Sequence, residues 1–371
     1  MLMKKIGVLL AAVVFLGVQA TCFACTSFQI KAEDCTVVVG RSNEFGIDAE
    51  SQIVFEPAGK LFTSKTPDGG KGKSWTSKYA YLGINGLGLA ESFGDGMNEA
   101  GLSIEGLYFT ESRYETPSAQ KAGIAVSNND FASWVLGNFA AADEVKEALS
   151  SIQVWGETVA ALGGPMPLHF AIHDASGKCV VVEFIGGVKK VYDNPIGVMT
   201  NMPEFPWHVM NLRNYLNLSA LIPGAKDFNG IMIKPTGTGA GWLGIPGDWS
   251  PPSRFVRIAY LVNATPQAKD RTSALNLAKH ILNTVDIPKG SVEAELKGKD
   301  VGVSVTKEYT QWSLLLDLTN RVMYYYGYDD MNLKFIDLRK IAADKASKKK
   351  FISMAQGFAA QDVVQKMQEM R

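Results

Sequence analysis

Runs of β-branched and aromatic residues, each bounded by Gly, Asn or Asp, recur along most of the chain. This pattern predicts β-strands, several of them joined as hairpins, at 36–40, 79–84, 102–109, 168–173, 179–185 and 196–200. Later runs predict one more hairpin and a further strand at 312–318, 321–328 and 334–338.

Apolar residues return at helical spacing in other segments. The spacing predicts helices at 131–139, 144–149, 207–218, 253–262 and 273–285. Because strands and helices come in separate blocks, we expect an α+β fold with two antiparallel sheets between helical layers, rather than a doubly wound parallel sheet. The chain has no long linker or repeat, so residues 25–371 are expected to form a single domain.

The amino terminus has the pattern of a secretory signal peptide. Lys4 and Lys5 precede an apolar run at 6–18, and a small and polar stretch at 19–24 follows. The apolar run is about 13 residues long, short of the roughly 20 that span a bilayer as a helix. We therefore expect an exported protein with no membrane span after processing.

The cleavage site is predicted before Cys25. Cys22 and Ala24 occupy the small-residue positions of a signal-peptidase site, which assigns 1–24 to a cleaved signal peptide. A lipid-anchored Cys25 is the alternative, but the aliphatic residue expected three positions before it is absent. The mature protein is therefore expected in the periplasm or outside the cell, with Cys25 as its first residue.

The amino-acid composition excludes some classes of function. The 37 basic and 37 acidic residues balance, so nothing in the charge favours nucleic acid or an anionic membrane. A hydrophobic content of 46% is that of a globular protein. In an oxidising compartment Cys35 and Cys179 could pair, or they are two small buried residues.

Cysteine at a mature amino terminus carries both a nucleophile and a base. The free α-amine has an ordinary pKa of roughly 7.7 to 8.0, which suits it to take the proton of its own thiol near neutral pH. Cys25 could then act as a catalytic nucleophile without a second residue as base. The alternative is an ordinary cysteine beside a cleavage site.

Several motifs in register resemble the choloylglycine hydrolase and penicillin V acylase family of linear amide C–N hydrolases. They are Cys25-Thr26-Ser27-Phe28, Gly40-Arg41-Ser42-Asn43-Glu44-Phe45-Gly46, Asp95-Gly96-Met97-Asn98-Glu99-Ala100-Gly101-Leu102, Leu168-His169-Phe170, Tyr192-Asp193-Asn194-Pro195, Thr200-Asn201-Met202-Pro203 and Ser253-Arg254-Phe255-Val256-Arg257. The resemblance covers nearly the whole mature chain. It implies the N-terminal-nucleophile hydrolase fold, an αββα sandwich, which agrees with the pattern of strands and helices.

The resemblance also implies roles for individual residues. Cys25 matches the nucleophile, and Arg41 matches the arginine whose charge favours the thiolate. Glu44 stands where the family usually has aspartate, and Asn43 where methionine is usual. Either acid could orient the Cys25 amine, but the departures leave the local geometry open.

Three further residues complete the expected site. Asn201 matches the family asparagine whose side-chain amide binds the developing oxyanion, and the backbone N–H of Tyr108 is expected to be the second donor. Arg254 matches an arginine near the active centre. Without the resemblance, these would be a turn residue, a packed strand aromatic and a charge at a helix start.

A metal or a cysteine–histidine dyad is the other chemistry to weigh. His169 and His173 point to the same face of a predicted strand, but two histidines without a third clustered ligand make a weak metal site. The signature of papain-like cysteines is absent around Cys25. We therefore expect structural histidines, no metal and no cofactor.

The expected substrate is a small non-peptide amide. Tyr108 resembles the penicillin V acylases, whereas bile salt hydrolases typically have asparagine there, so an aryl or fatty acyl amide such as penicillin V is preferred at this stage. Conjugated bile salts and acyl-homoserine lactones are the alternatives, and a non-catalytic secreted binding protein is the rival from another class. Homotetramers are frequent in the family, so a homotetramer is an open alternative to a monomer.

Overall fold

Two antiparallel sheets lie face to face between helices in the computed structural model, which describes residues 24–298, 302–344 and 346–364. The predicted signal peptide therefore lies outside the described residues except for Ala24. The first sheet has seven strands in the order β16-β1-β2-β20-β21-β22, with β19 also pairing with β20. Its strands are β1 (Cys25–Lys31), β2 (Val37–Phe45), β16 (Val198–Met199), β19 (Val292–Gly298), β20 (Gly302–Asp317), β21 (Val322–Gly327) and β22 (Lys334–Asp337).

The second sheet has eight strands in the order β15-β14-β13-β8-β7-β6-β3-β23. These are β3 (Gln52–Glu56), β6 (Tyr81–Asn85), β7 (Asp95–Asn98), β8 (Leu102–Tyr108), β13 (Leu168–Asp174), β14 (Cys179–Ile185), β15 (Val188–Asp193) and β23 (Lys350–Ser353). Short pairs outside the two sheets are β4 (Leu61–Lys65) with β5 (Lys71–Thr76), β9 (Ala125–Ser127) with β10 (Gln153–Trp155), and β11 (Thr158–Val159) with β12 (Gly164–Pro165).

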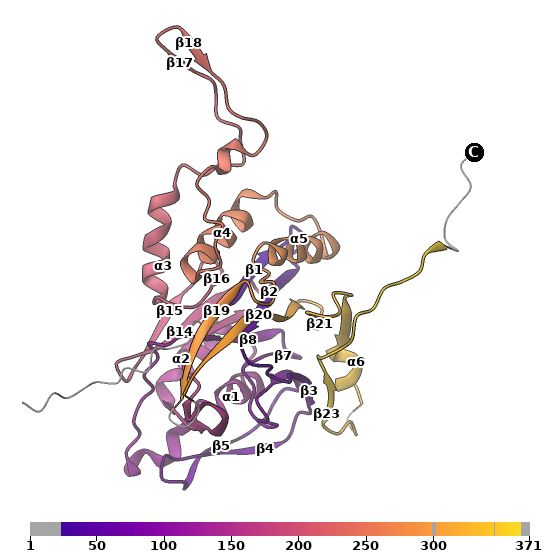
Figure 1. Cartoon of the computed structure of the whole chain (residues 1–371). Helices are drawn as coiled ribbons and strands as arrows, with labels where there is room; N and C mark the ends of the chain where they lie inside the picture. The colour runs from indigo at the N-terminus through magenta and orange to yellow at the C-terminus, as the bar shows by residue number, and fades with distance from the viewer. Residues whose placement is uncertain (1–23, 299–301, 345, 365–371) are drawn as a thin grey trace, which may run out of the picture.

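Helices cover the outer face of each sheet (Figure 1). On the first sheet, α4 (Pro251–Ala264) packs on β1 and α5 (Arg271–Asn283) packs on β2. On the second sheet, α1 (Phe131–Asn138) packs on β7 and α2 (Ala142–Ala148) on β14. The remaining helices are α3 (Phe205–Asn211), which contacts α4, and α6 (Leu338–Ala342), which contacts β21.

Local sequence explains where the two helices of the first sheet begin. Pro251 and Pro252 fall in the first turn of α4, where the missing backbone N–H costs no helical hydrogen bond. Asp270 and Ser273 form a reciprocal capping box at the start of α5. Both helices therefore start at fixed residues, which sets the position of Arg254 in the first turn of α4.

The space between the sheets is filled by apolar side chains from both. Val37 and Val39 of β2 and Leu316 of β20 belong to one buried cluster with Leu82 and Met97 of the second sheet. Two further clusters lie between each sheet and its helices. Because both faces of the central strands are covered, β2 begins with three consecutive buried valines instead of an alternating pattern.

One hairpin lies outside these layers. It is formed by β17 (Lys226–Phe228) and β18 (Ile231–Ile233) and projects beyond α4 at the top of Figure 1. All of its strand residues are exposed, including the apolar Phe228 and Ile231. The hairpin therefore contributes nothing to the core.

The expected fold class is confirmed, and the strand predictions at 102–109, 168–173 and 179–185 match β8, β13 and β14 within one residue. The expectation for the cysteines was wrong in part. Cys179 is buried, but Cys35 is exposed, and both thiols are free. No helix in the described part of the chain is long and apolar enough to cross a membrane.

A close cross-strand contact in the first sheet gives a test of this packing. Gly40 of β2 pairs with Phe28 of β1, and a Cβ at position 40 would lie 2.5 Å from Cζ of the Phe28 ring. We expect Gly40→Ala to lower the free energy of unfolding by about 1 to 3 kcal/mol, because the buried ring must move. Urea unfolding measures the effect. Gly224→Ala, where a Cβ has no atom within 4 Å, is the control, and equal unfolding midpoints for both variants would contradict the prediction.

Candidate active site

Cys25 is the first residue of β1, and the first sheet holds it from two sides. It pairs with Asn43 of β2, and its thiol donates to Asn43 Oδ1 at 3.8 Å. Its backbone N–H donates to Asn201 Oδ1 at 2.7 Å. In the full-length chain this nitrogen is still an amide joined to Ala24, whose carbonyl oxygen accepts from the Glu44 N–H at 2.9 Å. The residue is 4% exposed and lines a pocket, so the thiol is held and reachable.

Arg254 joins this strand start to the loop that carries Asn201. Its guanidinium donates from Nη1 to the Cys25 carbonyl and to Thr26 Oγ1, and from Nη2 to Asn201 Oδ1 at 2.7 Å. Nε donates to the Trp249 carbonyl at 2.9 Å. The guanidinium is fully buried, so these contacts replace water around a charge.

Asn201 connects three of the expected site residues. While its Oδ1 accepts from Cys25 and Arg254, its Nδ2 donates to the Tyr108 carbonyl at 2.8 Å. An amide group has two N–H hydrogens, so one is left for another acceptor. The expected roles of Asn201 and of the Tyr108 N–H in binding an oxyanion stay predictions.

Arg41 lies between the sheets beside the nucleophile. Its Nε and Nη2 donate to the two carboxylate oxygens of Asp95 at 2.6 and 3.3 Å, and Nη2 also donates to the Gly106 carbonyl. Burial alone would lower the pKa of Arg41, but the charges of Asp95 and Cys25 raise it above its usual value. The guanidinium therefore stays positive. Asp95 itself was missed as a site residue, although it opens one of the motifs of the sequence.

Glu44 lies on the other face of the first sheet. Side chains alternate along β2, so Arg41 and Asn43 face the second sheet and Glu44 faces the helical layer. Its Oε1 accepts from Thr310 Oγ1 at 2.9 Å. Burial raises the pKa of Glu44 to about 7, and the charge of Arg254 acts against that rise. Its expected role in orienting the Cys25 amine stays a prediction.

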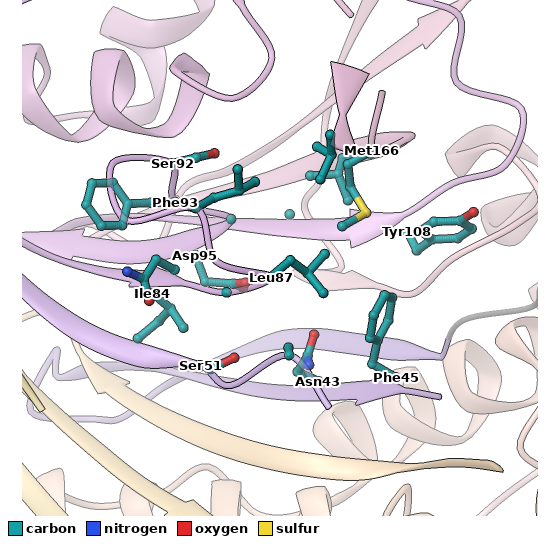
Figure 2. A pocket seen from close by; sticks show the side chains of 18 of the residues that line it. Asn43, Phe45, Ser51, Ile84, Leu87, Ser92, Phe93, Asp95, Tyr108 and Met166 are labelled. Carbon is teal, nitrogen blue, oxygen red and sulfur yellow. The ribbon is translucent and has the colours of Figure 1, made fainter. Parts of the chain in front are cut away.

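A pocket between the two sheets is lined by Cys25. Figure 2 shows side chains that line this pocket. The empty space inside it is about 810 Å3, which includes open solvent at its mouth. Most of the side chains that line it are apolar, and no lysine, arginine or histidine of the described chain is among them. Phe45, Tyr108 and Met166 lie at one end and Ile84 and Phe93 at the other (Figure 2).

The rim of the pocket depends on an irregularity in β20. Asn43 pairs with Trp312 and Glu44 with Thr310, so Gln311 is an extra residue opposite β2. The Gln311 side chain donates to the carbonyls of Phe45 and Ile47 and accepts from the Ala49 N–H. These bonds fix the segment after β2, and Phe45 and Ala49 of that segment line the pocket.

Both histidines of β13 make buried hydrogen bonds. His169 bonds Glu183 at 3.1 Å and the Thr200 carbonyl at 2.8 Å, directly before Asn201. His173 contacts Ser27 and Gln29 of β1, and burial lowers its pKa to about 3. Both histidines therefore bond to segments that carry site residues. Within the described ranges no group of three His, Cys, Asp or Glu side chains could hold a metal ion.

One planar guanidinium makes all the contacts of Arg254, so replacing this residue by lysine is expected to destabilise the protein strongly. We expect Arg254→Lys to lower the free energy of unfolding by about 3 kcal/mol, because one ammonium cannot reach all the acceptors that the guanidinium binds. Denaturant unfolding checks this. Arg113→Lys, at an exposed arginine, should unfold with the wild type, and a similar small effect of both variants would show that Arg254 holds nothing together.

Comparison with known proteins places this geometry in a family. The model of linear amide C–N hydrolases, choloylglycine hydrolase family, matches residues 25–351 and thus begins at Cys25. The chain is 33% identical over 323 residues to a bile salt hydrolase/transferase of Clostridium perfringens (strain 13 / Type A), covering 85% of this chain and 93% of the relative. A penicillin V acylase of Pectobacterium atrosepticum is 26% identical over 336 residues, 82% of this chain and 77% of the relative.

Solved structures agree with these matches. Two variants of conjugated bile acid hydrolase from Clostridium perfringens superpose with a TM-score of 0.78 at 29% identity, over 91% of this chain and at least 99% of theirs. One replaces a cysteine by alanine, and the other replaces an arginine sixteen residues further on by leucine. The chain therefore belongs to the choloylglycine hydrolase family of linear amide C–N hydrolases and has the N-terminal-nucleophile hydrolase fold.

Proposed function

We propose that this enzyme hydrolyses the amide bond of glycine- and taurine-conjugated bile acids with Cys25 as the nucleophile. The observation that carries the proposal is the apolar pocket at the Cys25 thiol, which has no basic side chain among its described lining and suits an uncharged, apolar acyl group. The Clostridium relative named for bile salts is 33% identical to this chain, and the penicillin V acylase is 26% identical. The substrate preference expected from Tyr108 alone is therefore reversed.

The chemistry uses the mature form that begins at Cys25. The free α-amine takes the thiol proton, and the thiolate attacks the amide carbonyl. The resulting oxyanion is stabilised by the second N–H of Asn201 and the backbone N–H of Tyr108. The amine then gives its proton to the departing nitrogen, which leaves a thioester that water hydrolyses.

Two charged residues support the nucleophile in this proposal. Arg41 is positioned to favour the thiolate, and its charge interacts with Cys25. The spacing of the two variants of the Clostridium enzyme agrees, because Arg41 also follows Cys25 by sixteen residues. Glu44 is the carboxyl group proposed to orient the Cys25 amine.

Export completes the proposal. Cleavage of residues 1–24 by a signal peptidase would free the Cys25 amine and deliver the enzyme to the periplasm or the medium. A homotetramer stays a prediction, and the exposed apolar hairpin β17–β18 is a surface that self-association would cover.

Penicillin V acylase is the second candidate, because of Tyr108. Its side chain packs at one end of the pocket beside Phe45 and Met166, where an aromatic ring can stack on a flat acyl group. Such stacking is worth about 0.5 to 1.5 kcal/mol, or at most roughly tenfold in rate. It biases the choice between acyl groups without deciding it.

A small panel of amides separates the candidates. We expect kcat/KM for glycocholate to exceed that for penicillin V by at least about tenfold, since the apolar pocket contributes more than one stacked ring. An N-acyl-homoserine lactone is the third substrate of the panel. Preference for penicillin V would restore the acylase assignment.

The same assay tests the nucleophile. We expect Cys25→Ala to lower kcat by at least about a thousandfold with little change in unfolding temperature. Cys35→Ser, at an exposed free thiol, is the matched control and should keep full activity. A wild-type protein that binds the panel but hydrolyses none of it would instead point to a binding protein.

A third prediction concerns processing. A protein that begins at Ala24 should fold as stably as the mature form, because the Ala24 carbonyl already accepts from the Glu44 N–H in the full-length chain. It should be inactive, because an acylated nitrogen has no basic lone pair. Mass spectrometry defines the amino terminus, and turnover by the extended form would contradict the proposed base.

A further inference from the structure

Two buried carboxyl groups lie together on the helix-facing side of the first sheet. Glu44 on β2 pairs with Thr310 on β20, and Glu308 is two residues from Thr310 and therefore on the same face. The exposed fractions of Glu44 and Glu308 are 0% and 1%. Among the described residues, Oε2 of Glu44 and Oε1 of Glu308 have no hydrogen-bond partner. An unpaired buried carboxylate oxygen is costly, so this arrangement needs an explanation.

The two groups cannot both be ionised at neutral pH without a large cost. Burial raises the pKa of Glu44 to about 7. Burial, and then the charge of Glu44, raise the pKa of Glu308 to about 8, although Arg254 opposes the rise. Like charges in a shared buried site titrate in two steps. Near neutral pH the pair therefore carries a single negative charge, because ionising the second buried carboxyl group beside the first is unfavourable.

Other charged and titratable groups surround the pair. Arg41 and Arg254 act on Glu44, and Glu44 and Asp286 act on Tyr326 of β21. Burial raises the pKa of Tyr326 to about 12, and Lys279 of α5 lies over its ring at 5.5 Å. Asp286, Thr310 and Tyr326 line a second cavity with an empty volume of about 720 Å3, and neither Glu44 nor Glu308 is among the residues that line it.

The link from the pair to the nucleophile runs through Arg254. Its charge acts on both carboxyl groups, and its guanidinium binds the Cys25 carbonyl and Asn201 Oδ1. The Glu44 carboxyl group reaches β20, where its Oε1 accepts from Thr310 Oγ1 at 2.9 Å.

We propose that Glu308 is a positioning residue that stays protonated beside Glu44, so that a single negative charge faces Arg254 and leaves its bonds to Cys25 and Asn201 intact. Ionisation of Glu308 adds a second negative charge, which draws the guanidinium from Cys25 and Asn201 toward the pair. Activity then falls on the alkaline side. The inference rests on the proposed function only in taking Cys25 as the nucleophile.

The first measurement is the pH dependence of kcat/KM for Glu308→Gln, whose amide stays neutral at every pH. We expect the wild type to lose about tenfold between pH 7.5 and 9, as ionisation at about 8 requires, and the variant to lose less than about threefold. Asp286→Asn removes the neighbouring carboxyl and should keep the wild-type alkaline limb. An unchanged limb in Glu308→Gln would overturn the proposal.

A second measurement does not need activity. Because the folded pKa of Glu308 lies above the unfolded value, the wild type loses stability as pH rises from about 4.5 to about 8. Glu308→Gln should lose less, so the difference in unfolding temperature, variant minus wild type, should grow over that range and then level off. A constant difference would mean that Glu308 does not titrate as proposed.

The two measurements separate the two proposals. If the wild type hydrolyses no amide but the unfolding temperatures behave as expected, the proposed function fails and the titration of Glu308 stands. If Glu308→Gln does not fold, Glu308→Met is also uncharged at every pH and should give the same two results. If either variant keeps the wild-type pH dependence in both measurements, Glu308 does not have the proposed positioning role.

Discussion

The site depends on one buried guanidinium. Arg254 lies in the first turn of α4. Its side-chain nitrogens donate to the carbonyl of Cys25, the side chain of Asn201 and the carbonyl of Trp249. Removing a charge from water is expensive, and the cost is offset only when nearly every donor has a partner. The helix, the first strand and the loop after β16 therefore have to be in place together.

The contacts of Arg254 explain how side chains on opposite faces of the first sheet can both act on Cys25. Alternation along β2 sends Arg41 toward the second sheet and Glu44 toward the helices. A side chain in the middle of a strand would lie on the face of Arg41 or on the face of Glu44, but not on both. Cys25 lies at the start of its strand, where its side chain faces the pocket and its backbone faces Arg254.

Sequence patterns predicted the strands in which apolar residues outnumber polar ones. The bounds of β8, β13 and β14 were predicted within one residue, because Ile, Leu, Val or Phe occupies at least three positions of each strand. In contrast, β2 was expected to end at Gly40 and reaches Phe45, because Arg41 to Glu44 break the apolar pattern to build the site. The first part of β20 and the whole of β1 were missed for a similar reason, since polar and site residues occupy their strand positions. The resemblance supplied Cys25, Arg41, Asn201 and Arg254, whereas the partners Asp95, Glu308 and Gln311 depend on contacts across the sheets that no local pattern reveals.

The extra residue of β20, Gln311, limits which mutations the protein can tolerate in this strand. Gln311 holds the segment at 45–49 at the pocket rim, while the residues on either side of it face opposite sides of the sheet. A substitution between Glu308 and Trp312 changes the contacts of one side chain. An insertion or deletion there would turn the following side chains to the wrong face and release the rim at the same time. Natural variants should therefore tolerate exchanges of residues in this stretch far better than changes in its length.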